Sequence, residues 1–206
     1  MARDTRRRLV EAAGELLEEG GYAAASVQAV ADRAGVSAGA LYRHFASKAE
    51  LFVEVFRESA KRELSAVDEA AAAGSCMERL EAAVATHARR ALRRRRLAWA
   101  LLHEPVDPLV DAERLVDRRR YCRHMAGLLR QAIAAGEIPD QDVEFSAAAM
   151  IGAIAESMVG PLSPVAGRIA SEDEVVGNLV RFCRRSVGIE EVPPRARSAA
   201  VARLPR

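Results

Sequence analysis

Apolar residues recur every three or four positions through most of this 206-residue chain. Near the N-terminus they are Leu9, Ala12, Ala13, Leu16 and Leu17. This spacing places them on one face of an α-helix. The alternating pattern of a half-buried strand and any internal repeat are absent from the sequence. The chain is therefore predicted to be an all-α protein.

Glycines and serines divide this pattern into separate helices. The pair Gly20-Gly21 ends the first helix, and Ser26 is a predicted N-cap of the second. Gly35 ends the second helix, Ser37 caps a third, and residues 47–50 form a capping box that opens a longer one. Further helices are expected near residues 77–94, 96–103, 109–135, 141–160 and 172–187.

The composition favours a soluble globular protein: 50% of the residues are hydrophobic and 29% are charged. No uninterrupted apolar run approaches the ~20 residues of a membrane span, and the N-terminus has no apolar signal core. The 3 cysteines are odd in number and far apart, which favours a reduced setting. We therefore expect a cytoplasmic protein without a membrane partner.

Residues 35–39 read GVSAG and match G-x-S-x-G, the nucleophile elbow of serine hydrolases. An elbow requires a buried strand before the serine, whereas residues 27–34 are apolar at helical spacing. We therefore expect the chain not to be an enzyme. A hydrolase that uses Ser37 remains an alternative, for which loss of esterase activity in Ser37→Ala would be the discriminating result.

The same segment has the spacing of a helix-turn-helix. Ala31 is small where two helices would cross, Gly35 tolerates a positive φ in the turn, and Val36 and Leu41 point back into a core. The outward face of the third helix then suits a major groove. It comprises Ser37, Ala38, Gly39, Tyr42, Arg43 and His44. A helical hairpin with a solvated face is the alternative.

Residues 5–56, TRRRLVEAAGELLEEGGYAAASVQAVADRAGVSAGALYRHFASKAELFVEVF, resemble the TetR family of one-component transcriptional regulators. Beyond them the likeness is limited to helical layout and length. The resemblance implies an N-terminal three-helix DNA-binding domain at 1–48 and a larger helical effector-binding and dimerisation domain at 49–188. Residues 189–206 are expected to be a disordered tail.

The resemblance also implies a homodimer that binds a palindromic operator in double-stranded DNA and responds to a small-molecule effector. Repression is the expected outcome. Activation, an architectural role, and a helical interaction module without DNA binding remain alternatives.

Specific DNA contacts follow from the same resemblance. Phosphate contacts are expected from Ser26, Ser37, Tyr42, His44 and Lys48. Base edges are expected to be approached by Gln28, Ala38, Gly39, Ala40 and Arg43. Ala38 stands where the family often has lysine, so we expect the shape of the DNA to carry much of the specificity.

The middle helices mix apolar bulk with a few polar groups, a pattern typical of a cavity for a largely apolar effector. The candidate lining residues are Trp99, Leu102, His103, Tyr121, Met125, Met150 and Met158. Plain core packing is the alternative. The arginine runs at 88–96 and 118–123 are expected to be solvated, with attraction of an acidic effector such as a coenzyme A ester as the alternative. We expect no metal and no cofactor, because the histidines and cysteines lack ligand spacing.

The last two helices carry broad apolar faces with small residues that permit close helix approach. In the family this pair forms a four-helix interface with its symmetry mate. The resemblance therefore implies a dimer interface made of Phe145, Ala148, Ile151, Gly152, Ala155, Val159, Val175, Leu179, Phe182 and Cys183.

Overall fold

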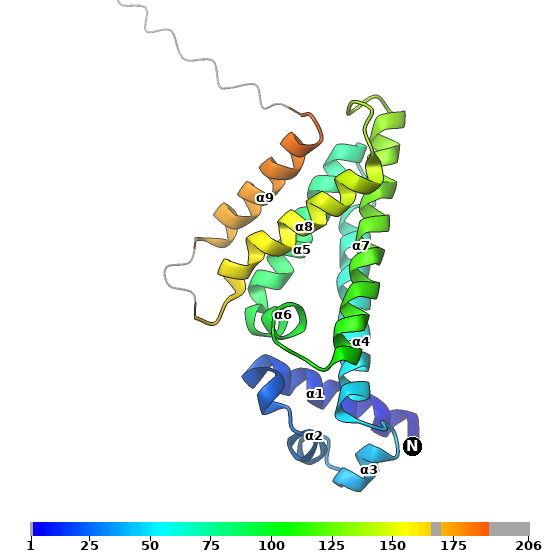
Figure 1. The fold of residues 1–206 in the computed structure, drawn as a ribbon, viewed down its shortest axis with the longest axis vertical. Helices are drawn as coiled ribbons and strands as arrows, with labels where there is room; N and C mark the ends of the chain where they lie inside the picture. The colour runs from blue at the N-terminus through cyan, green and yellow to red at the C-terminus, as the bar shows by residue number, and fades with distance from the viewer. Residues whose placement is uncertain (1, 166–169, 190–206) are drawn as a thin grey trace, which may run out of the picture.

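A computed structural model describes residues 2–165 and 170–189. Within these residues the chain is all-α with no strand, which confirms the predicted fold class (Figure 1). The helices are α1 (Ala2–Ala24), α2 (Val27–Arg33), α3 (Ala38–Tyr42), α4 (Lys48–Ala70), α5 (Cys76–Arg93), α6 (Arg95–Leu102), α7 (Pro108–Ala134), α8 (Val143–Leu162) and α9 (Glu172–Ser186). The expected disordered tail lies outside the described residues, except for residue 189.

Serine side chains begin the helices where the sequence predicted them. Ser26, Ser37 and Ser47 each accept a hydrogen bond at 3.1 Å from the backbone N–H three residues further on. These bonds satisfy N–H groups that have no partner inside the helix. The capping box at residues 47–50 is only half formed, because the Glu50 carboxylate accepts from the N–H of Ala46 instead of Ser47.

Two glycines with positive φ shape the N-terminal helices. Gly21 has φ 73° and ψ −171°, so the helix of α1 is interrupted at the predicted place, although α1 resumes as far as Ala24. Gly35 has φ 66° in the turn between α2 and α3. A side chain is rarely tolerated in this left-handed region, which explains glycine at both positions.

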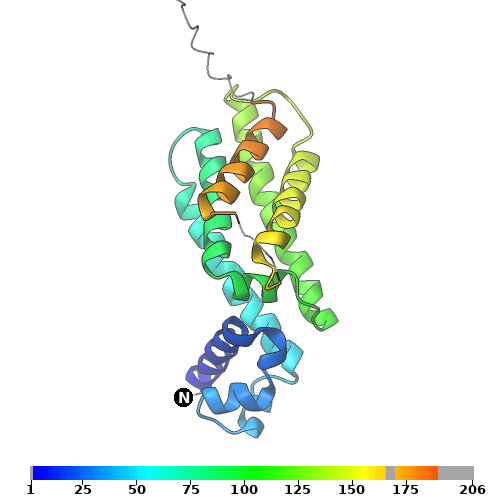
Figure 2. The ribbon, with the colours of Figure 1, turned by 90° about the vertical axis from the view of Figure 1, so that its left-hand side faces the viewer.

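The helices pack into a small lower part and a larger upper part, seen clearly in Figure 2. The lower part holds α1–α3 around a core that includes Leu9, Leu41 and Phe45. Phe52 of α4 and Leu97 of α6 belong to the same core. The boundary proposed between residues 48 and 49 therefore falls at the first turn of a helix that serves both parts.

The upper part is a helical bundle of α5, α7, α8 and α9 together with the rest of α4. Within the described residues α8 is the single helix that is long and apolar enough to cross a membrane, a test that core helices of soluble proteins also pass. Here α8 packs against α7 and α9. Only 28% of its most apolar window is buried, so this helix leaves apolar surface uncovered.

Candidate nucleic-acid interface and effector cavity

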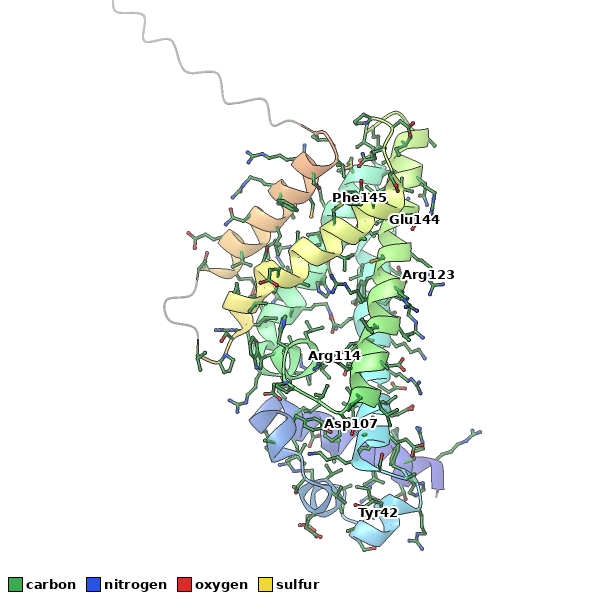
Figure 3. All side chains as sticks on the ribbon, viewed as in Figure 1. Tyr42, Asp107, Arg114, Arg123, Glu144 and Phe145 are labelled. Atoms are coloured by element: carbon green, nitrogen blue, oxygen red, sulfur yellow. The ribbon has the colours of Figure 1, made fainter. Side chains whose placement is uncertain are left out.

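The third helix presents an exposed aromatic and an exposed cation. Tyr42 is 54% exposed and lies at the lower end of the molecule, far from Phe145 of the upper part (Figure 3). Arg43, the next residue, is also exposed, and it forms no ion pair with any residue that the structure describes. Both side chains are therefore available to an external partner.

The remaining residues of this surface are small or polar. Ser26, Gln28, Ser37 and Gly39 are exposed, while Ala38 and His44 are half-buried. Three of them already have partners within the protein. The hydroxyls of Ser26 and Ser37 cap α2 and α3. The Gln28 amide donates to Asp32 at 2.7 Å.

Ala40 does not belong to the outward face. It is only 8% exposed and lies beside fully buried Leu41 on the inner side of α3. A helix of five residues has little more than one turn, so about half of it must cover the core. The expectation that Ala40 approaches base edges is corrected by this placement.

Lys48 is held against α1 at the start of α4. Its ammonium donates to the carbonyl oxygen of Tyr22 at 3.1 Å and lies 4.1 Å from the centroid of the Tyr22 ring. The ring of Phe52 is 5.4 Å away. Burial lowers the pKa of this lysine. A phosphate would therefore have to share the ammonium with Tyr22.

Glu104 joins the lower part to the loop that follows α6. Its carboxylate accepts a hydrogen bond from the Tyr22 N–H at 2.7 Å. The residue before this donor is Gly21, where an added Cβ would overlap the same carboxylate. The peptide units around Tyr22 are thus held by Glu104 from the loop after α6 and by Lys48 from the first turn of α4.

An apolar cavity of about 330 Å³ lies inside the upper part, bounded by α4, α5, α7 and α8 and by the end of α6. A smaller cavity of about 100 Å³ adjoins it. The residues that line both cavities are Phe56, His87, Ala91, Leu102, Asp117 and Tyr121. Such a volume is at the low end of that of small-molecule sites.

Five of the seven candidate effector residues line the larger cavity: Leu102, His103, Tyr121, Met125 and Met158. Trp99 and Met150 do not. Trp99 stacks on His103 with ring centroids 5.1 Å apart, and Met150 is fully buried in the core. Helical periodicity predicts the face of the helix on which a residue lies, but not whether that face borders the core or the cavity.

Three histidines on the cavity wall carry ring nitrogens without a hydrogen-bond partner. These atoms are Nδ1 of His87 and Nε2 of His103 and His124, and all three are buried. Burial lowers the pKa of His87 and His103. His87 was not among the predicted effector residues, because nothing in its spacing along the chain indicates that a cavity lies beside it.

Some residues of the predicted dimer interface are exposed in the structure, and others are buried. Phe145 is 73% exposed, and Ala148 and Phe182 are also exposed, whereas Gly152 and Val159 are half-buried. Val175, Leu179 and Cys183 are buried within this chain, because their face of α9 packs against α5.

Ile151 and Ala155 line the cavity. Both are half-buried, so their place in a dimer interface stays a prediction. Val175, Leu179 and Cys183 are corrected from interface to interior.

Ser37 has no elbow geometry. It follows α2 and a turn, whereas an elbow serine follows a strand, and its hydroxyl is the N-cap of α3. The segment GVSAG is therefore the turn and cap of a helix-turn-helix.

A helix-turn-helix attached to a larger helical domain is an architecture of transcriptional regulators. Comparison with known proteins agrees with this class. Residues 9–55 match the bacterial regulatory proteins of the tetR family, and residues 73–158 match the tetracyclin repressor-like C-terminal domain. The chain belongs to the TetR family of transcriptional regulators and is not an enzyme.

Among curated relatives, the transcriptional repressor KstR of Mycobacterium tuberculosis is 40% identical over 73 residues, which are 35% of this chain and 33% of that protein. The transcriptional activator FasR of Mycolicibacterium smegmatis is 44% identical over 71 residues, 34% of this chain and 32% of that protein. The chain thus matches about a third of the length of these relatives.

Solved structures extend the likeness to most of the chain. A TetR/AcrR family regulator from Thermobifida fusca is 28% identical with a TM-score of 0.70, covering 91% of this chain and 100% of that one. The regulator FadR from Bacillus subtilis, solved in complex with stearoyl-CoA, is 20% identical with a TM-score of 0.73, covering 90% and 99%. The second likeness shows the fold alone.

Proposed function

We propose that this chain is a cytoplasmic, ligand-responsive repressor that binds a palindromic operator as a homodimer. The observation that carries the proposal is the exposed pair Tyr42 and Arg43 on a serine-capped α3, in a helix-turn-helix attached to a cavity-bearing domain. Such a helix can place both side chains in a major groove. Activation is the second candidate, favoured by the relative named as an activator.

DNA selection with the purified protein tests the binding function and yields the operator with its symmetry. Arg43→Ala is expected to change base preference by about 1–3 kcal/mol at one position, as for a bidentate contact to guanine. Tyr42→Phe is expected to weaken binding to all sequences alike, because phosphate contacts carry no base information. If both variants keep the affinity and the base preference of the unchanged protein, the DNA-binding surface lies elsewhere. Reporter output from the selected operator then separates repression from activation.

Two copies of the chain are proposed to meet through the exposed side of α8 and the outer side of α9. The support is the uncovered apolar surface there, above all Phe145 and Phe182. A symmetric pair would bury the same patch on both copies, and would set two α3 helices at a fixed separation for successive grooves. The molar mass in solution by light scattering tests this, with Phe145→Ser and Phe182→Ser expected to give monomers.

The effector is proposed to occupy the cavity of the upper part. The support is its mainly apolar lining and the three unpartnered imidazole nitrogens. The fold neighbour solved with stearoyl-CoA is consistent with a long apolar ligand. A ligand would release DNA only if it bound the two dimer geometries with different affinity.

A further inference from the structure

The wall shared by the two cavities carries three polar side chains in one cluster. Asp117 and Tyr121 are four residues apart on α7 and therefore share a face of that helix. The Tyr121 ring stands edge-on to His87 of α5, with ring centroids 5.4 Å apart. All three residues line both cavities. We call His87, Asp117 and Tyr121 the polar wall.

Two members of the polar wall, His87 and Asp117, have unmet hydrogen-bonding capacity. The Nδ1 atom of His87 is buried and has no partner. Asp117 is buried and, among the residues that the structure describes, receives no hydrogen bond and forms no ion pair. A buried polar atom normally has a partner, and leaving one without it is unfavourable, as at Nδ1 of His87. A ligand that supplies the partners would regain the lost free energy.

The wall is uncharged except for its one carboxyl group. Burial lowers the pKa of His87 and raises that of Tyr121, so both are neutral near pH 7. Burial also raises the pKa of Asp117. A neutral imidazole offers one donor and one acceptor, a phenol offers both, and a carboxylate offers only acceptors.

Three arginines of the cavity walls have partners, whereas Arg118 of the larger cavity has none among the residues that the structure describes. Arg90 donates to Glu63 at 2.8 Å, and Arg94 donates to Glu18 at 3.1 Å. Arg114 donates to the carbonyl oxygens of α6. A ligand carboxylate at the polar wall would lie against the Asp117 carboxylate, and this repulsion between like charges is unfavourable in a buried site.

We propose that the polar wall binds the hydroxyl group of an uncharged, mainly apolar alcohol. The hydroxyl donates to the Asp117 carboxylate and accepts from Tyr121 or His87, while the apolar body fills the larger cavity. A carboxylate cannot donate to Asp117, and an ammonium cannot accept from the two neutral groups and brings a charge into the interior. This inference rests on the proposed effector cavity and names the chemical class of its ligand.

Three probes of one length test the proposal: 1-decanol, decanoate and decylamine. The cavity holds about eleven non-hydrogen atoms at roughly 30 Å³ each, which is the size of these probes. Calorimetric titration of the full chain is expected to show decanol binding at least about tenfold more tightly than either ion. Tighter binding of decanoate or of decylamine, equal binding of all three, or binding of none would overturn the proposal.

Variants locate the hydroxyl. Asp117→Leu is expected to abolish the preference for decanol, Tyr121→Phe to reduce it, and Asp117→Asn, which keeps an acceptor oxygen, to retain most of it. Asp140→Asn makes the same change at an exposed position in the loop before α8 and is expected to leave the preference unchanged. An unaltered preference in both Asp117→Leu and Tyr121→Phe would overturn the placement.

The same protein samples are assayed for binding to the selected operator without any probe. If the protein binds the operator but shows no preference for decanol, only this inference is refuted. If the protein prefers decanol but does not bind the operator, the proposed function is refuted and the proposed ligand class is retained.

Discussion

Removal of the Glu104 carboxylate is expected to weaken the junction between α1 and the loop after α6. In Glu104→Ala the Tyr22 N–H, a part-buried donor bonded at 2.7 Å, loses its acceptor. Hydrogen bonds to charged groups contribute about 1.5–3 kcal/mol, and an orphaned donor costs a similar amount, so we expect a loss of ~2 kcal/mol in the free energy of unfolding. Glu104→Gln keeps an acceptor oxygen without its charge and should lose ~1 kcal/mol.

Urea denaturation followed by circular dichroism measures the effect. With an m value of about 2–3 kcal/mol/M, a loss of ~2 kcal/mol lowers the midpoint by about 0.7–1 M. Protein concentration must be the same for all variants, because dimerisation shifts the midpoint. Glu156→Ala is the matched control, since this glutamate is exposed and has no hydrogen bond among the described residues. Its midpoint should not change.

Gly21→Ala supplies an independent test of the same junction. The substitution places a side chain at φ 73°, and its Cβ overlaps the Glu104 carboxylate, so the carboxylate must move. The two changes should therefore be non-additive: Glu104→Ala should cost less in the Gly21→Ala background than alone. Additive losses, or a midpoint unchanged in Glu104→Ala, would refute the assigned role of this contact.

Three further outcomes are expected. Ser37→Ala should lose about 1 kcal/mol of stability as a missing N-cap, which thermal denaturation would show; a gain in stability would contradict it. Leu179→Ala should lose about 2–5 kcal/mol as a core cavity, whereas Phe182→Ala should change molar mass in light scattering with little effect on monomer stability. Hydrogen bonds from the first N–H groups of α5 lower the pKa of Glu137. The Glu137 carboxylate therefore stabilises the fold above the ordinary pKa of glutamate, and this stabilisation is lost as the pH falls through its lowered pKa. In Glu137→Gln the free energy of unfolding should depend less on pH on the acidic side.

The local features of the fold were predictable from the sequence. The serines at 26, 37 and 47 cap helices because their hydroxyls bond N–H groups only three residues away. The turn glycine at 35 is equally local. Such signals depend on neighbours in the chain and need no knowledge of the tertiary arrangement.

Features that depend on which other element a helix face packs against were not predictable from the sequence. The spacing around Leu179 predicts that α9 has an apolar face. It does not tell whether that face packs on α5, as it does here, or on a second copy of the chain. Ala40 lies within a short helix where one residue separates the inner from the outer side. The bond between Glu104 and Tyr22 spans 82 positions, and no local pattern marks it.

The shortness of α3 limits what this chain can demand of a DNA sequence. Five residues rise only about 7.5 Å at ~1.5 Å each, a little more than two base steps at about 3.4 Å. Ala40 and Leu41 are turned inward, so under the proposed function direct reading in each groove is restricted to a few neighbouring base pairs. Mutations elsewhere in a binding site would leave those contacts intact. Sites that diverge between strains can therefore keep the same regulator, and new sites need few substitutions to arise.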